Sequence, residues 1–179
     1  MAIRTISAAY FVGDLLIPNI SGSTTTEQAN LLPLQIAIAK QEPIYLKKLM
    51  GVDLYDAYVA GIAVGSPAAK WVTLNNLIYY TNTALTALNT GISPVANYVY
   101  FKYMEQNATT TLTGIEGKGT HENFTVETPG PKMVAAWNEM VRLSEEIQDF
   151  IVDNDTDYPE FYTSDIAPET FERKNNWGI

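Results

Sequence analysis

The amino-acid sequence predicts an all-α protein: a small helical bundle with a long projecting loop or β-hairpin arm and an extended C-terminal tail. Three observations support this. Apolar residues recur at helical spacing in several segments, most clearly over 131–153. Residues 107–131 are rich in Thr, Gly and Glu and form a connection too long for an ordinary loop. Beyond residue 157 the chain is polar and acidic, with single apolar residues spaced along it.

The composition is that of one folded domain. The chain has 179 residues, of which 46% are apolar, and these values suit a single hydrophobic core. We expect residues 1–157 to form one helical domain that includes the arm 107–131, and residues 158–179 to form an extended docking tail. Because the chain has no Cys, disulfides and thiolate metal sites are excluded.

No targeting or membrane segment is expected. The short apolar stretch near the N-terminus is interrupted by Gly13 and Asp14, which makes it a poor signal peptide. No apolar run approaches the roughly 18 residues that a membrane span needs. We therefore expect a soluble protein that is made inside the cell and has no membrane partner.

Pro and Gly residues divide the first part of the chain into short helices. Thr25 or Thr26 is the expected N-cap of a helix over 27–41. Pro43 has the position of a first-turn proline, so a new helix is expected to begin there and to end at Gly51.

Three more helices are expected, over 53–61, 66–89 and 94–107. Asp53 caps the first and Gly61 closes it, while Ser66 and Pro67 open the second. The third has aromatic residues around most of its circumference, so it lies at the centre of the fold or contacts a neighbouring molecule. These aromatics are Tyr98, Tyr100, Phe101 and Tyr103.

The arm contains two segments with strand character. Residues 109–113 and 123–127 alternate or favour β-branched side chains, and three glycines lie between them, so a hairpin is predicted. A two-stranded hairpin is marginal alone in water, which suggests that the arm pairs with another molecule. The candidate subunit-interface residues are Thr111, Leu112, Thr113, Gly114, Ile115, Phe124 and Val126.

The clearest helix, 131–153, is followed by the tail. One face of this helix is apolar, and the other carries acids that include Glu145, Glu146 and Asp149. Apolar residues spaced along a polar tail are explained better by docking than by solvation, since each would contribute about 1.5 to 3 kcal/mol if fully buried. The candidate partner-docking residues are Phe161, Tyr162, Ile166, Phe171, Trp177 and Ile179.

No motif indicates catalysis, a cofactor or a metal. The acidic run 153–157 has calcium-loop spacing, but Tyr158 stands where the loop needs Gly and Ser164 where it needs Glu. Lys118 lacks the following Ser or Thr of a phosphate-binding loop, and Leu112 stands where its first Gly belongs. His121 is the only histidine and lies in the polar arm. We therefore assign no catalytic, cofactor-binding or metal-binding residues.

The negative charge is concentrated near the C-terminus. The formal net charge is -9, and residues 139–179 carry three bases against eleven acids, which gives -8. Phosphate contacts need Lys and Arg, so this part of the chain is a poor nucleic-acid binder. The asymmetry indicates an interaction surface or tail.

The order of these features resembles the head-tail connector proteins of tailed bacteriophages, also called adaptor or head-completion proteins, and is most similar to those of phages that infect Bacteroidetes. The resemblance covers most of the chain. Its most specific segment is Leu-Met-Gly-x-x-Leu-Tyr within YLKKLMGVDLYDAY, residues 45–58. It is accompanied by YFKYMEQN at 100–107, TLTGI at 111–115, WNEM at 137–140 and a terminal NNWGI at 175–179.

The resemblance implies a structural virion protein at the head-tail interface, made in the host cytoplasm. It implies a homo-oligomeric ring, commonly of twelve copies, that docks on the portal protein, extends the DNA channel and carries the next neck or tail component. Double-stranded DNA would pass through without specific binding. If part of the acidic surface from Glu139 to Asp157, with Glu145, Glu146 and Asp149, faces this channel, like-charge repulsion keeps DNA from adhering to the wall. In the alternative orientation these acids face outward and serve only solubility.

Two other classes stay open at the level of sequence. One is a different neck or tail-completion ring, such as a stopper or tail terminator, although such proteins are typically richer in strands. The other is an enzyme with a carboxylate-only or metal-assisted site, which a pH-dependent activity or a metal retained after chelation would reveal.

Overall fold

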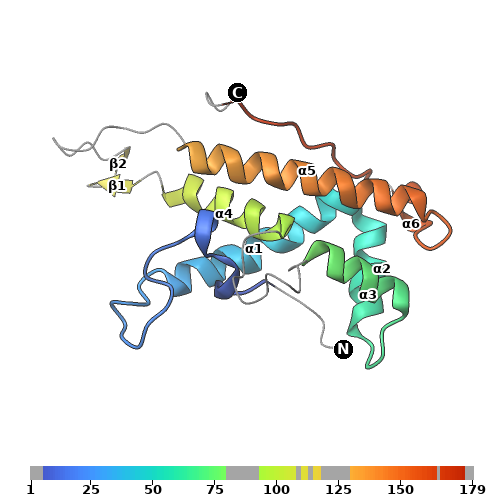
Figure 1. Cartoon of the computed structure of the whole chain (residues 1–179), viewed down its shortest axis with the longest axis horizontal. Coiled ribbons are helices and arrows are strands. Elements are labelled where there is room, and N and C mark those ends of the chain that lie inside the picture. Colours follow the sequence, from blue (N-terminus) through green and yellow to red (C-terminus); the bar gives the residue numbers. More distant parts are fainter. Residues whose placement is uncertain are drawn as a thin grey trace.

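A computed structural model of the chain describes residues 6–79, 93–107, 110–112, 115–117, 130–164 and 166–175. In these residues the predicted helical class is confirmed, because helices form the packed body (Figure 1). The elements are the 3-10 turns η1 (Ala8–Tyr10) and η2 (Gly13–Leu15), the helices α1 (Leu31–Met50), α2 (Val52–Ala63), α3 (Ala69–Ile78), α4 (Pro94–Asn107), α5 (Pro131–Asp153) and α6 (Glu160–Thr163), and the strands β1 (Thr110–Leu112) and β2 (Ile115–Gly117).

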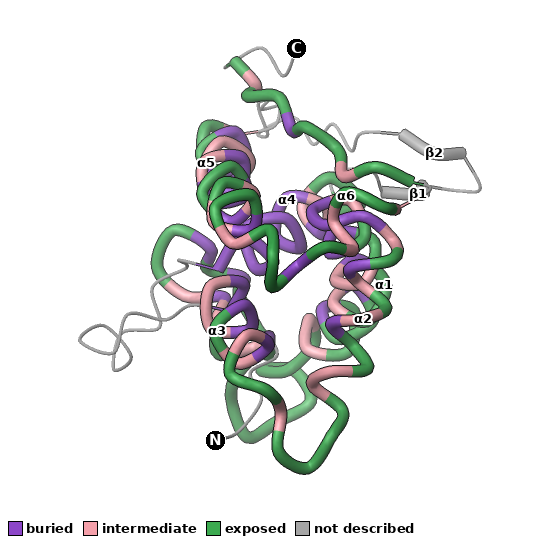
Figure 2. The backbone as a smooth tube through the Cα atoms, turned by 90° about the vertical axis from the view of Figure 1, so that its right-hand side faces the viewer, coloured by how far each residue is buried: buried purple, intermediate pink, exposed green. Residues whose placement is uncertain are grey.

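Helix α4 lies at the centre of the fold. Figure 2 shows its buried backbone between α5 on one side and the α1–α3 group on the other. All residues from Pro94 to Phe101 are buried, as is Tyr103. The aromatic residues all around this helix therefore reflect a central position, the first of the two alternatives that the sequence allowed.

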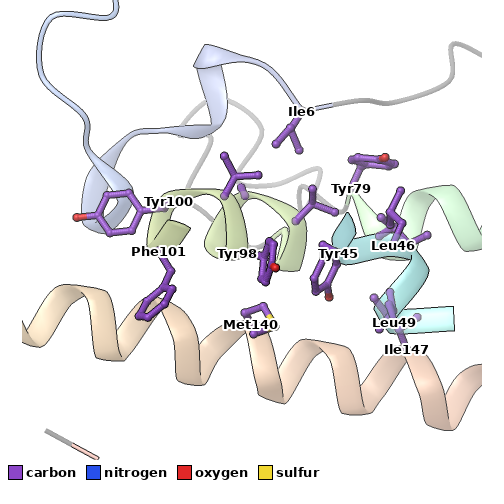
Figure 3. Packing of buried hydrophobic residues seen from close by; sticks show 14 of the residues in the cluster. Ile6, Tyr45, Leu46, Leu49, Tyr79, Tyr98, Tyr100, Phe101, Met140 and Ile147 are labelled. Carbon is purple, nitrogen blue, oxygen red and sulfur yellow. The ribbon is translucent and has the colours of Figure 1, made fainter. Parts of the chain in front are cut away.

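The core is formed where α1, α4 and α5 meet. Figure 3 shows Tyr45 and Tyr98 side by side above Met140, and the ring centroids of the two tyrosines are 5.1 Å apart. The hydroxyl group of Ser144 donates to the carbonyl of Met140 at 2.7 Å, so the Tyr45 hydroxyl, also 2.7 Å away, donates to Ser144. Burial raises the pKa of Tyr45, which keeps this hydroxyl protonated as a donor.

Helix α1 corrects two sequence predictions. It runs without interruption through Pro43, which therefore does not begin a new helix. Pro43 has no N–H for the carbonyl of Ala39, but Ala39 is exposed and water can bond that carbonyl. The buried Gln41, Tyr45 and Leu46 on either side anchor both halves of the helix in the core.

The start of α1 also differs from the prediction. Residues 25–30 form turns, and α1 begins only at Leu31. Neither Thr25 nor Thr26 caps the helix; a reciprocal pair forms one turn earlier, where the Thr24 hydroxyl accepts from the Glu27 amide at 3.2 Å and the Glu27 carboxylate accepts from the Thr24 amide at 2.9 Å. This reciprocal pair satisfies two backbone donors ahead of the helix.

Helices α2 and α3 are held together by a close approach. Gly61 was expected to end its helix, but α2 continues to Ala63. A Cβ atom at Gly61 would lie 2.1 Å from Nε1 of Trp71, so the glycine gives the indole its place on α2. The helix predicted over 66–89 begins later, since α3 runs from Ala69 to Ile78 and Tyr79 is in a turn; residues 80–89 of the prediction lie outside the described part.

The described part of the arm is a short antiparallel ladder. Thr110 pairs with Gly117, Thr111 with Glu116 and Leu112 with Ile115. Residues 110–112 of the first predicted strand therefore pair with 115–117, while the second predicted strand, 123–127, lies outside the described residues. Residues 118–129 lie outside the described part, so a longer arm hairpin stays a prediction.

Helix α5 confirms its predicted bounds, 131–153, with Pro131 in its first turn. Its apolar face packs on α4 and α1, and Met140, Val141 and Ile151 are fully buried. Among the described helices, none has both the length and the apolar character for crossing a membrane.

Candidate interaction surfaces

The tail folds back on its own chain. After α6 it runs beside α5 in the opposite direction, as Figure 1 shows for its red-brown trace. Its contacts begin at Ser164 and extend to Lys174. We call the surface that receives it the tail site, and define this by the side chains that hold residues 169–174: Tyr45, Lys48, Trp137, Asn138, Glu145 and Gln148.

The tail site binds the tail mainly through main-chain atoms. Nε2 of Gln148 donates to the carbonyls of Leu49 at 2.9 Å and Glu169 at 3.2 Å. Nε1 of Trp137 donates to the carbonyl of Glu172 at 2.7 Å. A protein surface that contacts the main chain holds an extended segment in a defined register, as a sheet edge does.

Asn138 makes the most specific of these contacts. Its Nδ2 donates to the carbonyl of Lys174 at 2.9 Å, and its Oδ1 accepts from the amide of the same residue at 2.8 Å. The side-chain amide thus pairs with one residue of the tail in the way that a β-strand residue pairs across a ladder.

Phe171 is the buried anchor of the tail. Its side chain is 9% exposed, and its ring stacks on Tyr45 with centroids 5.7 Å apart and an interplanar angle of 25°. The Trp137 ring meets it edge-on at 6.5 Å. The predicted docking residue Phe171 therefore docks on its own chain in this structure. A single aromatic residue in a polar segment predicts that its side chain is buried, but it does not predict which surface buries it.

Ser164 fixes the start of the tail. Its hydroxyl accepts from the amides of Val52 at 3.1 Å and Asp53 at 3.3 Å, so it caps the N-terminus of α2 from a position far along the chain. Gly51, with φ +80°, makes room for this approach, because a Cβ there would lie 3.0 Å from the Ser164 hydroxyl and from the carbonyl of Ile166.

Two exposed ion pairs join the tail to the helices. Lys48 pairs with Glu169 at 2.7 Å, and Arg173 pairs with Glu145 at 3.3 Å. Their side chains are between 36% and 62% exposed, so each pair contributes at most about 1 kcal/mol. Nζ of Lys174 lies 5.2 Å from the Trp137 ring centroid and adds a cation–π contact.

Two predicted docking residues are open to solvent. Tyr162 is 58% exposed and Ile166 is 63% exposed, while Phe161 is half-buried against the core. Trp177 and Ile179 lie outside the described residues. Tyr162 and Ile166 are therefore the described tail residues whose apolar side chains remain available to another molecule.

The acids proposed to face a channel lie on the exposed side of α5. Glu146 pairs with Arg142, and Glu145 pairs with Arg173 of the tail. The hydrogen bond from Arg142 lowers the pKa of Glu139 and keeps it ionised. Asp149 makes no ion pair among the residues that the structure describes.

Four of the predicted arm residues fall outside the described part: Thr113, Gly114, Phe124 and Val126. Thr111, Leu112 and Ile115 lie on β1 and β2, which project beyond the ends of α4 and α5 in Figure 1. The arm thus leaves the helical body at the end of the molecule opposite α2, α3 and α6.

The strongest buried polar cluster lies between α1, α2 and α3. The hydroxyl of Tyr79 donates to Glu42 at 2.5 Å, and Nδ2 of Asn75 donates to the Tyr58 hydroxyl at 2.7 Å. Burial raises the pKa of Glu42 above its ordinary value of 4.5, and burial raises that of Tyr58 to about 12. These hydrogen bonds join α1 to the residue that follows α3, and α3 to α2.

Metal chemistry receives no support from the described acids. In the stretches that can be described, no three His, Asp or Glu side chains gather closely enough to hold an ion. The acidic turn after α5 instead bonds α3: Lys70 donates to the carbonyl of Asp157 at 2.5 Å, and the Tyr158 hydroxyl donates to the carbonyl of Lys70 at 2.8 Å. His121 and Lys118 lie outside the described residues.

Sequence reasoning missed the polar residues that hold the tail. Asn138 and Gln148 belong to the half-buried margin of α5 and Ser164 follows α6, and nothing in their spacing distinguishes them from solvated residues. The one available signal was Trp137, because the N–H of an indole that packs in a protein usually finds an acceptor. A scan against protein-family models and searches of curated proteins and of solved structures found no match to this chain.

Proposed function

We propose that the chain is a structural virion protein, a head-tail connector subunit that assembles into a ring, docks on the portal of a tailed phage and extends its DNA channel toward the tail. The observation that carries the proposal is the order of segments described above, with the Leu-Met-Gly-x-x-Leu-Tyr motif at its centre. In the fold this motif spans the end of α1 and the start of α2, where Gly51 joins the two helices and the tail crosses them.

The arm supports assembly through another copy. Strands β1 and β2 have three residues each and stand beyond the packed helices. A ladder of that size gains little stability alone in water, so an added strand from a neighbour would stabilise it. A ring needs two different faces in contact, and an arm on one end of each copy can supply one of them.

The proposed partners follow from this role. They are other copies of the chain, in a ring of about twelve by the resemblance stated above; the portal protein; and the next neck or tail component. Tyr162 and Ile166, exposed near α6, are the described apolar side chains that could meet the portal or a neighbour. Double-stranded DNA would pass the acidic face of α5 without binding it.

The test is the solution mass of the purified chain, measured by light scattering over a concentration series and followed by electron microscopy. A matched variant replaces residues 108–129 with a short Gly-Ser linker and leaves the helices intact. The proposal expects ring-sized particles for the full chain and their loss in the variant. A monomer whose arm is cut quickly by protease is expected if only the portal orders the arm. A monomer with a protease-resistant arm and tail overturns the proposal.

A further inference from the structure

The contacts that hold the tail depend little on its being part of the same molecule. Gln148, Trp137 and Asn138 bind carbonyl and amide groups of the tail, and Lys48 adds a main-chain acceptor for the amide of Glu169 at 2.7 Å. An identical segment from another copy would offer the same atoms in the same register.

The closed tail is held by a small free energy. Among residues 166–175, Phe171 is the one buried side chain, and Glu169, Thr170, Glu172 and Arg173 are exposed. Burial of one aromatic ring, exposed ion pairs and a few main-chain hydrogen bonds must offset the entropy of ordering the segment. Opening is therefore expected to be frequent compared with global unfolding.

If the tail opened, the aromatic side chains of the tail site would be exposed to water. Tyr45 and Trp137 contact Phe171 directly, and Trp137 also packs on Phe101 with ring centroids 4.8 Å apart. The charges of the tail site restrict which segment can bind there. Lys48 pairs with Glu169, two residues before Phe171, and Glu145 pairs with Arg173, two residues after it. The sequence Glu169-x-Phe171-x-Arg173 fits this order.

We propose that the tail site exchanges tails between copies: it receives residues 169–174 of a second copy of this chain in the same register as its own. Ser164 marks the pivot, because it caps α2 and lies five residues before the first pinned residue, Glu169. Residues 164–175 span at most roughly 40 Å when extended, which is enough to reach an adjacent molecule. The inference does not depend on the ring or on a phage role.

Exchange is governed by concentration. A tail on a short linker has an effective concentration near its own site of about a millimolar, so tails from other copies compete once the protein itself reaches that range. In a ring or any other close assembly the neighbouring tail would be present at a comparable local concentration.

The experiment uses the full chain, which has no Cys and so accepts single cysteine probes. One preparation carries E145C and a second, distinguished by a tag, carries R173C; the two positions are exposed and paired in the structure. They are mixed at about 1 mM, incubated, and treated with a short thiol cross-linker. The expected result is a cross-linked dimer of one tagged and one untagged chain, in severalfold excess over the control.

Three controls make the result decisive. The control pair is R173C with S66C, an exposed position in the connection between α2 and α3, and Figure 1 shows this connection on the side of the molecule away from the tail. The double variant E145C/R173C must cross-link within one chain, which verifies the register. Adding F171A to the R173C chain must reduce the dimer to the control level, because that tail has lost its anchor.

A mixed yield no higher than the S66C control, with the double variant cross-linking internally, overturns the proposal. So does a dimer that F171A leaves unchanged, since the contact would then come from another surface. Ring formation by the wild-type chain is read separately from its mass, so the failure of exchange is distinguishable from the failure of the connector role.

Discussion

Replacement of Phe171 by Ala tests whether the tail is part of the folded domain. The ring is 9% exposed and is held between Tyr45 and Trp137 at centroid distances of 5.7 and 6.5 Å. Removal of a buried Phe side chain costs about 3 to 5 kcal/mol in a closed core. Phe171 lies at the edge of the core on a segment that can move, so the cost is expected at about 2 to 3 kcal/mol.

The reason for the lower figure is that the tail can release before the domain unfolds. Once a variant tail is open in most molecules, no further loss reaches the helices, so the free energy of tail closure sets the upper limit of the effect. Two amides report closure directly: that of Glu169, bonded to the carbonyl of Lys48 at 2.7 Å, and that of Lys174, bonded to Oδ1 of Asn138 at 2.8 Å. A loss of 2 to 3 kcal/mol would speed their hydrogen exchange by about 30- to 150-fold.

The assay is amide hydrogen exchange on the full chain, combined with denaturant unfolding of wild type, F171A and Y162A. Tyr162 is the matched control, an aromatic tail residue on α6 that is 58% exposed and lies outside residues 169–174, and Y162A should leave both amides and the unfolding free energy nearly unchanged. If F171A exchanges these two amides at the wild-type rate, the tail is not held by Phe171 and the assignment of the tail site is wrong.

Three further predictions follow from other parts of the fold. G61A should destabilise the protein by about 1 to 3 kcal/mol in denaturant unfolding, because a Cβ 2.1 Å from the Trp71 indole displaces it; a neutral or stabilising result would contradict the close approach. E42Q keeps an oxygen for the Tyr79 hydroxyl but removes a carboxyl group whose pKa in the folded protein lies above its ordinary 4.5. The free energy of unfolding of the wild type should therefore fall relative to that of E42Q as the pH rises from 4.5 through the folded pKa. A difference between the two proteins that does not change with pH would refute this. On the proposed channel role, reversal to Lys of the α5 acids Glu145, Glu146 and Asp149 should create salt-sensitive DNA binding in a mobility-shift assay or slow genome passage, whereas equal binding after reversal of Asp53, Asp56 and Glu105 would show that the α5 face is not special.

The sequence predicted best where one physical requirement dominates. Helix 131–153 has an apolar stripe that persists over its whole length, so its bounds could be read from periodicity. The segment 94–107 was predicted to be a helix that lies at the centre of the fold or contacts a neighbouring molecule, because aromatic residues surround most of its circumference, and the structure shows the central position. Both predictions rest on burial alone.

Prediction failed where tertiary contacts outweigh a local preference. Pro43 favours the first turn of a helix, but the buried residues on both sides of it keep α1 continuous. Gly61 has the local character of a helix end, while its actual role is to admit Trp71 from α3. The sequence around Pro43 or Gly61 does not show which distant residues will pack there.

The tail shows a different limit. Its spaced apolar residues led to the prediction that the tail docks on a partner. Phe171 packs within its own chain instead, because an apolar residue does not specify which surface buries it. The side chains of Asn138 and Gln148, which complete the site, bind main-chain atoms of the tail and so impose little on the tail sequence. Such contacts leave no pattern in either segment.

The tail and the arm would contribute to assembly in different ways. Residues 169–174 of the tail already make their contacts within one molecule. They can bind a neighbour only by giving up contacts of the same kind, so the net gain from exchange comes from proximity and not from new interactions. The arm ladder β1–β2 stands beyond the helices, and an added strand would bring it hydrogen bonds that it does not have alone. Assembly driven by the arm should therefore bring tails within reach of neighbouring sites, and in that order: loss of the arm should abolish tail exchange at low concentration, while loss of the Phe171 anchor should leave assembly through the arm intact.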